Sequence, residues 1–379
     1  MVDAKKTQKS SMPNFRISPK GSVDAYFMVT VFILLAFGLI MVYSASSASA
    51  YHQFGDNFFY MRKQLIWGGL GIFGLFFFAN FNYHKLSKLS LPILIGSIIL
   101  LALVPIVGVS VNGARRWLGI GQLTFQPSEV AKYAIVIFFS FSLSKNYESL
   151  KKFKGLLPYL GLIGIYAVLL MLEPHFSGTL LIAVTALFIL FSAGARIWHF
   201  ILLFFPVAAG GAALVIAEPY RWARVTAFMD PFADLQGDGW QTVQSLFAIG
   251  SGGLFGVGLG QSRQKFLYLP EPQNDFIFSV LCEELGWIGA ILVIGLFVFL
   301  IWRGFKIASK APDLFGTLLA TGIITLIAVQ ALVNIAVVTS SMPVTGMPLP
   351  FFSAGGSVLT FTLMGMGIML NISKQADLA

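Results

Sequence analysis

Asp275 is the residue whose type and place most suggest chemistry. It stands immediately before Phe276-Ile277-Phe278, so its carboxylate lies where a polar segment enters an apolar one. Partial desolvation raises the pKa of a carboxyl group and makes it a better base near neutral pH. Aspartate is also favoured as a helix N-cap, where it accepts bonds from free backbone N–H groups. The sequence therefore supports both a general base and a helix cap, although capping lowers the pKa and opposes the effect of desolvation.

Two further pairs of charged residues lie within apolar segments. Glu129 and Lys132 are three residues apart, so they share one face of a helix. They either face a functional cavity or neutralise each other at a helix end. Glu283 and Glu284 follow about two helical turns after Asp275. A carboxylate of this pair that faces the protein interior needs a polar partner or a proton.

Basic residues cluster near the same polar segments. Arg115 and Arg116 lie in the segment 112–117. Arg263 and Lys265 precede Asp275 by about ten residues. The guanidinium fork suits phosphate, so these residues suggest an anionic substrate, with phosphate the leading candidate. Arginines that snorkel from a helix end towards water are the structural alternative for the first two.

Other kinds of site find little support in the sequence. The single cysteine, Cys282, excludes a disulfide within the chain, and the Gly-rich stretch 256–260 lacks the strand–turn–helix context of a dinucleotide site. No Walker A sequence is present. His175 lies near Glu173 and could act as a base or face solvent. The histidines form no zinc pattern: His52, His84, His175 and His199.

The elements that position these residues are apolar helices. The chain has 379 residues, of which 57% are apolar and 11% charged, whereas a soluble domain has about 25% charged residues. A spanning helix needs about 20 mostly apolar residues. We expect an all-α integral membrane fold with about ten transmembrane helices in one polytopic domain (23–375), preceded by a basic tail (1–22). A large loop (218–275) precedes the eighth helix. The expected spans lie near 25–46, 64–82, 90–110, 128–144, 155–172, 177–194, 198–217, 276–302, 315–339 and 351–372.

The distribution of Lys and Arg predicts the orientation. With a cytoplasmic N-terminus, the inside segments hold about twice as many basic residues as the outside segments. Both termini are then cytoplasmic, and the loop 218–275 is extracytoplasmic. The first apolar stretch is longer than the 7–15 residues of a signal-peptide core, which favours an uncleaved anchor. The net charge of +9 reports topology here and does not indicate nucleic acid.

The motifs resemble those of the SEDS family (FtsW, RodA and SpoVE), the polytopic proteins of bacterial cell-wall growth. The resemblance covers nearly all of the chain, and the stretch from Gly258 to Lys265 is closest to the FtsW/SpoVE branch. The matching stretches are Asn112-Gly113-Ala114-Arg115-Arg116-Trp117, Gln126-Pro127-Ser128-Glu129 through Lys132, Gly258-Leu259-Gly260-Gln261-Ser262-Arg263-Gln264-Lys265, Leu269-Pro270-Glu271 through Asp275-Phe276-Ile277-Phe278, Glu283-Glu284-Leu285-Gly286, and Gly346-Met347-Pro348-Leu349-Pro350 through Ser353-Ala354-Gly355-Gly356-Ser357.

The resemblance implies ten spans in the bacterial cytoplasmic membrane and peptidoglycan glycosyltransferase activity on lipid II. It also implies a class B penicillin-binding protein as partner, and it matches Asp275 to the family's essential acidic residue. Family members often read Gln-Pro-Asp where this chain has Glu173-Pro174-His175. An acidic contribution from that turn is therefore in doubt unless Glu173 supplies it.

The resulting hypothesis is an inverting polymerase of lipid II and undecaprenyl-linked glycan, in division or sporulation, with Asp275 as the general base. The expected substrate-binding residues are Arg115, Arg116, Glu129, Lys132, Arg263 and Lys265, supported by Glu283 and Glu284. A divalent cation, Mg or Mn, would use substrate phosphates plus one or two carboxylates. The alternatives are a lipid II flippase, whose path Glu129 and Lys132 would line, and a scaffold that recruits a penicillin-binding protein.

Overall fold

The computed structural model describes residues 21–377, apart from 112–113, 121–122, 218, 234–236, 238 and 267. Most of the predicted basic tail, residues 1–20, therefore lies outside the described residues. The helices that correspond to the ten expected spans are α1 (Ala25–Phe54), α2 (Phe59–Asn80), α3 (His84–Val107), α4 (Pro127–Asn146), α5 (Leu157–Leu172), α6 (Phe176–Ser192), α7 (Ile197–Ile216), α10 (Ile277–Ser309), α11 (Leu314–Val338) and α12 (Gly356–Ser373).

The expected all-α membrane fold is confirmed by these helices. Within the described ranges, five of them are long and apolar enough to cross a membrane: α1, α3, α10, α11 and α12. Helices α5, α6 and most of α7 form shorter apolar stretches. Helices α2 and α4 have 22 and 20 residues, and each carries charged residues in its first two turns. Each expected span therefore overlaps a helix, although the bounds differ by a few residues for some of them.

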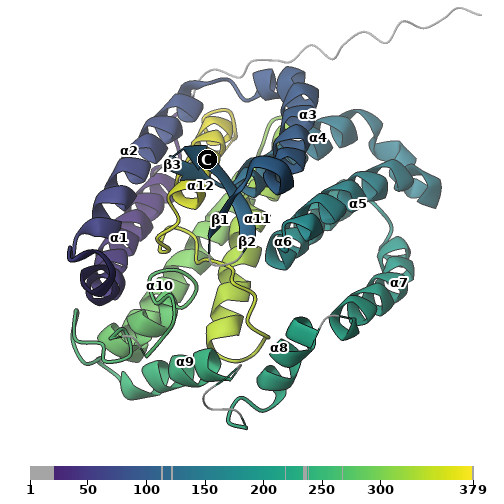
Figure 1. Ribbon diagram of the computed structural model, residues 1–379. Coiled ribbons are helices and arrows are strands. Elements are labelled where there is room, and N and C mark those ends of the chain that lie inside the picture. Colours follow the sequence, from purple (N-terminus) through teal and green to yellow (C-terminus); the bar gives the residue numbers. More distant parts are fainter. Residues whose placement is uncertain are drawn as a thin grey trace, which may run out of the picture.

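Helices α11 and α12 lie in the middle of the bundle, with α1 and α2 on one side and α3 to α6 on the other (Figure 1). Helix α12 packs along α2, and α11 packs against α4, α6 and α10. The contact between α2 and α12 depends on Gly367, where a Cβ would lie 2.3 Å from the carbonyl oxygen of Leu75. Small residues allow membrane helices to approach this closely, because packing rather than the hydrophobic effect holds them together in lipid.

A small antiparallel sheet separates α3 from α4. It consists of β1 (Val109–Val111), β2 (Ala114–Ile120) and β3 (Leu123–Phe125), in the order β1-β2-β3. The third span had been expected to continue to about residue 110, but α3 ends at Val107 and its C-cap, Gly108, is extended. Arg115 and Arg116 therefore lie on a strand, and the alternative that placed them at a helix end is wrong.

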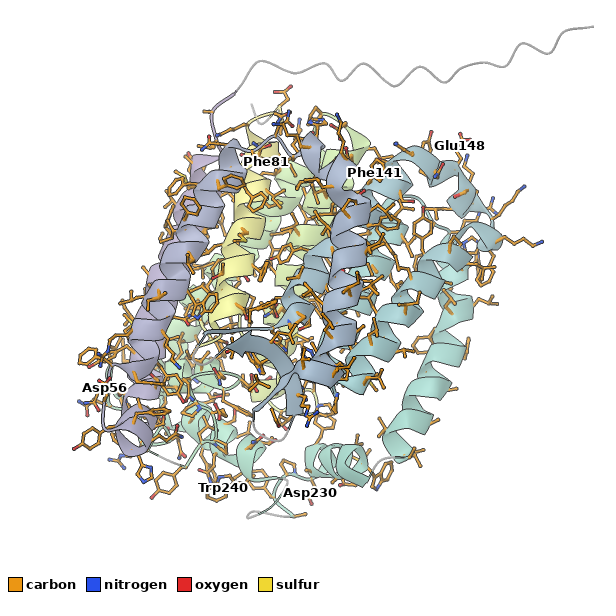
Figure 2. All side chains as sticks on the ribbon, turned by 45° about the horizontal axis from the view of Figure 1, so that its top comes forward. Asp56, Phe81, Phe141, Glu148, Asp230 and Trp240 are labelled. Atoms are coloured by element: carbon orange, nitrogen blue, oxygen red, sulfur yellow. The ribbon has the colours of Figure 1, made fainter. Side chains whose placement is uncertain are left out.

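The segment before α10 contains two further helices and an irregular stretch. Helices α8 (Pro219–Met229) and α9 (Trp240–Ser251) lie at one end of the bundle, and the short 3₁₀ segments η1 (Tyr147–Lys151) and η2 (Phe153–Gly155) lie at the other (Figure 2). Helix α9 packs against α10 and α11. Its Ser245 hydroxyl donates to the carbonyl of Val338 at 2.6 Å. Helix α9 thereby joins the segment before α10 to the bundle.

Candidate functional site

Asp275 lies directly before α10 but does not cap it. The helix begins at Ile277 and its N-cap is Phe276, so the predicted capping role of Asp275 is wrong. Asp275 is half-buried. Its backbone carbonyl accepts a hydrogen bond from the side-chain amide of Asn334 at 2.7 Å, and the same amide donates to the carbonyl of Met347 at 2.8 Å. Asn334 on α11 thus joins the entry of α10 to the segment between α11 and α12.

That segment, residues 339–355, forms the wall beside Asp275. Gly346 has a φ of 70°, and a Cβ at this position would lie 3.4 Å from Oδ2 of Asp275. The hydroxyl of Ser353 donates to the carbonyl of Asn274 at 3.0 Å, and Ala354 N–H donates to the carbonyl of Gln273 at 2.9 Å. Two motifs that are about 70 residues apart in the sequence therefore fix the backbone around one carboxylate.

Glu129 and Lys132 form a buried ion pair on α4. Their side chains meet at 2.7 Å, with only 5% and 6% of each exposed. The expectation that spacing places them on one helical face is confirmed, and the pair has the geometry of mutual neutralisation. Lys132 therefore directs its charge to Glu129 in this structure. Its predicted role in substrate binding remains a prediction.

Arg115 and Arg116 point to different partners, because successive residues of a strand face opposite sides. Arg116 Nε donates to the carbonyl of Glu173 at 3.2 Å, and its Nη2 donates to the carbonyl of Pro174. Arg115 is exposed, and its Nη1 reaches the carbonyl of Pro105 at 3.4 Å. Arg116 therefore holds the turn between α5 and α6, whereas the guanidinium of Arg115 lies at the surface.

The turn held by Arg116 contains two buried titratable groups. The Glu173 side chain is fully buried, and among the described residues neither of its carboxylate oxygens has a hydrogen-bond partner. Burial raises its pKa from 4.5 to about 8, despite the positive charge of Arg116. His175 is also buried, so the solvent-facing alternative is wrong. Burial, with the charges of Arg116 and Lys132, lowers the pKa of His175 to about 3, which keeps its ring neutral.

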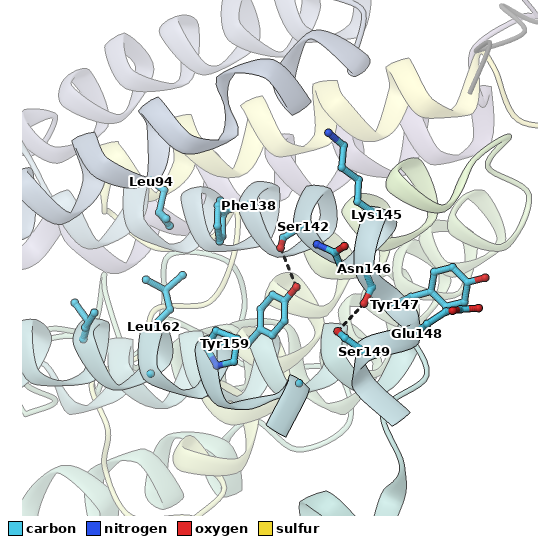
Figure 3. A pocket seen from close by; sticks show the side chains of 14 residues that line it. Leu94, Phe138, Ser142, Lys145, Asn146, Tyr147, Glu148, Ser149, Tyr159 and Leu162 are labelled. Carbon is cyan, nitrogen blue, oxygen red and sulfur yellow. Dashed lines mark hydrogen bonds between the residues drawn. The ribbon is translucent and has the colours of Figure 1, made fainter. Parts of the chain in front are cut away.

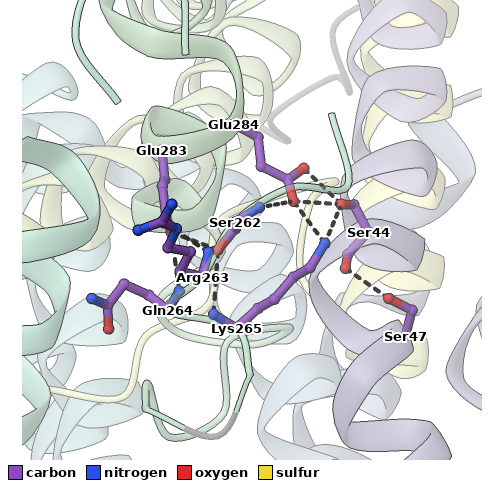
Figure 4. Close-up of polar contacts among 8 residues, drawn as sticks. All are labelled: Ser44, Ser47, Ser262, Arg263, Gln264, Lys265, Glu283 and Glu284. Carbon is purple, nitrogen blue, oxygen red and sulfur yellow. Dashed lines mark hydrogen bonds and ion pairs between the residues drawn. The ribbon is translucent and has the colours of Figure 1, made fainter. Parts of the chain in front are cut away.

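Lys265, Glu283 and Glu284 belong to a buried polar network between α1 and α10 (Figure 4). Lys265 Nζ lies 2.9 Å from Oε1 of Glu284, and both side chains are almost completely buried. Ser44 on α1 donates to the same carboxylate at 2.6 Å. The carboxylate of Glu283 accepts a hydrogen bond from the hydroxyl of Ser262 at 2.5 Å and another from the backbone N–H of Arg263 at 2.8 Å. Each glutamate thus has the polar partners that its burial requires.

The two glutamates directly precede a break in α10. Gly286 has φ 67° and ψ −169°, far outside the helical region, so the carbonyls before it and the N–H groups after it lose their helical partners. The segment 253–258 replaces those partners in both directions. Val257 and Gly258 donate to the carbonyls of Glu283 and Glu284 at 2.9 and 3.0 Å. Trp287 and Ile288 donate to the carbonyls at positions 253 and 254 at 3.0 and 3.2 Å.

These backbone hydrogen bonds explain why positions 256 and 286 are glycines. A Cβ on Gly286 would lie 2.4 Å from the backbone nitrogen of Gly256, and a Cβ on Gly256 would lie 2.1 Å from the carbonyl oxygen of Glu284. Both glycines also have positive φ. The Gly-rich stretch 256–260 therefore permits close backbone contact with the broken helix, as glycine does where two backbones approach.

The described hydrogen bonds and ion pairs do not bring the predicted site residues together in one place. Asp275 lies with the segment 339–355, and Lys265 and the backbone of Arg263 lie with the two glutamates of α10. Arg116 bonds the turn at 173–175, whereas Glu129 and Lys132 pair with each other and Arg115 bonds Pro105. Sequence reasoning missed Asn334 and Ser44, which connect these groups to α11 and α1. The signal that could have identified Asn334 is the presence of two side-chain amides, Gln330 and Asn334, within the otherwise apolar span of α11.

No dedicated metal cage is present in the part of the chain that the structure describes. Groups of three or more His, Cys, Asp or Glu side chains that could hold a metal ion are absent there. A cation at this site would have to take most of its ligands from water or substrate phosphates, as Mg²⁺ commonly does.

The model of the family described as Cell cycle protein, which comprises FtsW, RodA and SpoVE, matches residues 24–378. The chain belongs to this family. It is 46% identical to stage V sporulation protein E of Bacillus subtilis (strain 168), over 94% of this chain and 98% of that protein. It is 42% identical to the probable peptidoglycan glycosyltransferase FtsW of Coxiella burnetii, over 94% of this chain and 97% of that protein.

The fold comparison agrees with the family assignment. A chain from the structure of a peptidoglycan synthase complex, in which polymerization and crosslinking are coordinated, superposes with a TM-score of 0.78 at 30% identity. The match covers 93% of this chain and 97% of that one. The resemblance to the FtsW/RodA/SpoVE family is thereby confirmed, and the protein is a multi-pass membrane protein.

Proposed function

We propose that this FtsW/RodA/SpoVE-family protein is a peptidoglycan glycosyltransferase that polymerises lipid II, with Asp275 as the general base. The observation that carries the assignment of Asp275 is the difference in burial between the carboxylates. Glu129 and Glu284 are each buried against a lysine, and Glu283 accepts bonds from Ser262 and the backbone. Asp275 is only half-buried, and its backbone is held from both sides by α11 and the segment 339–355.

In the proposed reaction, the carboxylate of Asp275 accepts the proton of the acceptor sugar hydroxyl. The hydroxyl oxygen forms a bond to the anomeric carbon of the lipid-linked donor glycan. The bond from that carbon to the pyrophosphate oxygen breaks, and undecaprenyl pyrophosphate leaves with the electron pair and with inversion at carbon. General-base assistance supplies about 10²–10⁴-fold, so electrostatic stabilisation of the leaving pyrophosphate must supply much of the remaining acceleration.

Exposed cations are the best candidates for that electrostatic role. Arg115 and Arg263 are exposed, whereas the ammonium groups of Lys132 and Lys265 are already paired with glutamates. We therefore propose that the arginines contact the pyrophosphate and that the buried pairs hold the helices which carry the site. We also propose that a divalent cation assists by binding substrate phosphates beside Asp275.

The proposed orientation places both termini in the cytoplasm and Asp275 at the outer face of the bacterial cytoplasmic membrane. The distribution of Lys and Arg supports it. A class B penicillin-binding protein is the proposed partner, because the similar solved chain comes from a peptidoglycan synthase complex. The flippase alternative gains no support from Glu129 and Lys132, since the two charges neutralise each other within the bundle.

The test is polymerisation of lipid II by the purified protein, alone and with its penicillin-binding partner. Asp275→Asn keeps the shape of the side chain but cannot accept the proton, so we expect the rate to fall by about 10²-fold or more. Asp56→Asn is the matched control, because Asp56 is a carboxylate that pairs with Arg62 and lies at the end of the bundle that holds Asp230 and Trp240 (Figure 2).

Three outcomes separate the proposals. Normal polymerisation by Asp275→Asn would exclude the general-base role. A wild-type protein that polymerises no lipid II even with its partner would exclude the glycosyltransferase and leave the scaffold or flippase. Full activity in EDTA would exclude the cation.

A further inference from the structure

A cavity of about 970 Å³ lies beside the end of α4 (Figure 3). Glu148, one of its lining residues, lies at the far end of the molecule from Asp230 and Trp240 (Figure 2). The cavity is bounded by α3, the end of α4, η1 and the first half of α5. It is therefore distinct from the site around Asp275.

The inner wall of this cavity is apolar. Leu94, Phe138, Leu162 and Ile165 contribute its hydrocarbon surface. The hydroxyl groups of Ser142 and Tyr159, which also line it, are 2.8 Å apart and satisfy each other. A ligand that enters the cavity therefore meets aliphatic and aromatic groups and few open hydrogen-bonding positions.

The rim of the cavity is cationic. Lys145 is exposed and is one of the lining residues at the edge of the cavity. Its Nζ lies 4.3 Å from the centre of the Phe141 ring, and Figure 3 shows the side chain directed away from Tyr159. The adjoining segments η1 and η2 add three exposed lysines, Lys151, Lys152 and Lys154, against the single acid Glu148. The opening thus combines an apolar interior with a positive edge.

The outer surfaces of α3 and α5 beside the cavity are also apolar and exposed. Leu91 and Ile95 on α3 are 52% and 49% exposed, and Leu157 and Val168 on α5 are 51% and 63% exposed. In a membrane-spanning bundle this surface lies against acyl chains, because few polar groups face hydrocarbon. The cavity is therefore an extension of the lipid-facing surface and not a site for a water-soluble ligand.

We propose that this cavity binds an anionic phospholipid of the leaflet at that end of the bundle. One acyl chain occupies the apolar interior, and the phosphate lies against Lys145. Basic pockets between transmembrane helices recognise anionic head groups in this way, and juxtamembrane lysines add electrostatic attraction. The proposal depends on the membrane fold and not on the activity assigned to Asp275.

Native mass spectrometry of the intact protein in detergent tests the proposal. The protein is titrated with phosphatidylglycerol or, separately, with phosphatidylcholine that has identical acyl chains. We expect stronger retention of phosphatidylglycerol and a reduction of about fivefold in Lys145→Gln. Lys85→Gln is the control, because Lys85 also lies over a phenylalanine ring, at 5.4 Å from its centre, but outside the cavity lining.

A second pair of variants tests the cavity itself. Gly161 lines it, and a Cβ there would meet no atom within 4 Å, so Gly161→Phe fills the space without a backbone clash. Gly295 on α10 is equally open and lies outside the cavity, so Gly295→Phe is the control. We expect only Gly161→Phe to lose the bound phosphatidylglycerol.

Equal retention of the two lipids by the wild-type protein would overturn the proposal. So would unchanged binding of phosphatidylglycerol by Lys145→Gln. If Gly161→Phe does not fold, the lipid comparison and the two lysine variants still decide the outcome.

Discussion

Replacing Gly286 by alanine should uncouple the broken helix α10 from the segment 253–258. Gly286 adopts φ 67° and ψ −169°, a region that is essentially restricted to glycine. An added Cβ would lie 2.4 Å from the nitrogen of Gly256 and 2.5 Å from the carbonyl oxygen of Leu254. Both are backbone atoms, so no flexible side chain can move aside to make room.

The expected cost follows from two contributions. Holding a non-glycine residue in such a conformation costs about 1–3 kcal/mol. Separating the backbone of α10 from that of the segment 253–258 would weaken or break four hydrogen bonds, each worth about 0.5–1.5 kcal/mol. Their donors are the backbone N–H groups of Val257, Gly258, Trp287 and Ile288. Gly286→Ala should therefore lower the free energy of unfolding by about 3–9 kcal/mol, with the upper part reached only if all four bonds break.

The assay is unfolding of the purified protein in detergent, with hydrogen exchange to locate the damage. Gly295→Ala is the control on the same helix, because its Cβ would meet no atom within 4 Å. Removing a helix-interior glycine there should stabilise the protein by about 0.5–1 kcal/mol. The amides of Val257 and Gly258 should exchange faster in Gly286→Ala than in the wild type. Equal unfolding of Gly286→Ala and the wild type would refute the argument from backbone geometry.

Three further predictions concern buried polar groups. Glu284→Gln leaves Lys265 buried without its counter-ion and should destabilise the protein by about 3–5 kcal/mol. In thermal unfolding, adding Lys265→Met should recover part of this loss. If the stability changes of the two single variants simply add in the double variant, the pairing is contradicted. Glu173 binds a proton more tightly in the folded state than in the unfolded state. The stabilisation that results is complete below pH about 4.5 and is lost as pH rises to about 8, a decrease of up to about 5 kcal/mol in the free energy of unfolding. Glu173→Gln should remove that pH dependence of unfolding; an unchanged pH profile would show that the carboxyl is not the source. Asn334→Leu loses both hydrogen bonds to the carbonyls of Asp275 and Met347. Lipid II polymerisation should therefore slow by about tenfold or more, while partner binding persists. A variant with wild-type activity would contradict this positioning role.

The helices of this protein could be predicted from the sequence because each is determined locally. Hydrocarbon about 30 Å thick requires about 20 apolar residues in every spanning helix, and that requirement is visible in a short window of sequence. The pairing of Glu129 with Lys132 could be predicted for the same reason, since residues three apart on a helix are neighbours. The break in α10 could not, because it depends on backbone hydrogen bonds to the segment 253–258, which belongs to another part of the chain.

The fate of each charge was decided by tertiary structure. Lys265 is surrounded by loop residues in the sequence, yet it is buried against Glu284 and against Ser44, which lies 221 residues away along the chain. His175 was expected to act as a base or to face solvent, and the packing of its turn against Arg116 and α4 excludes the solvent-facing alternative.

The sequence by itself therefore determined the membrane class, the helices and the residues able to do chemistry. Only the tertiary structure decided which charges are neutralised and which carboxylate stays at the edge of the bundle. Asp275 shows the difference: its position before an apolar run suggested a cap or a base, and the cap was excluded because α10 begins at Ile277. Burial and partners are set by residues far apart in the chain, and the cost of burying an unpaired charge makes those partners decisive.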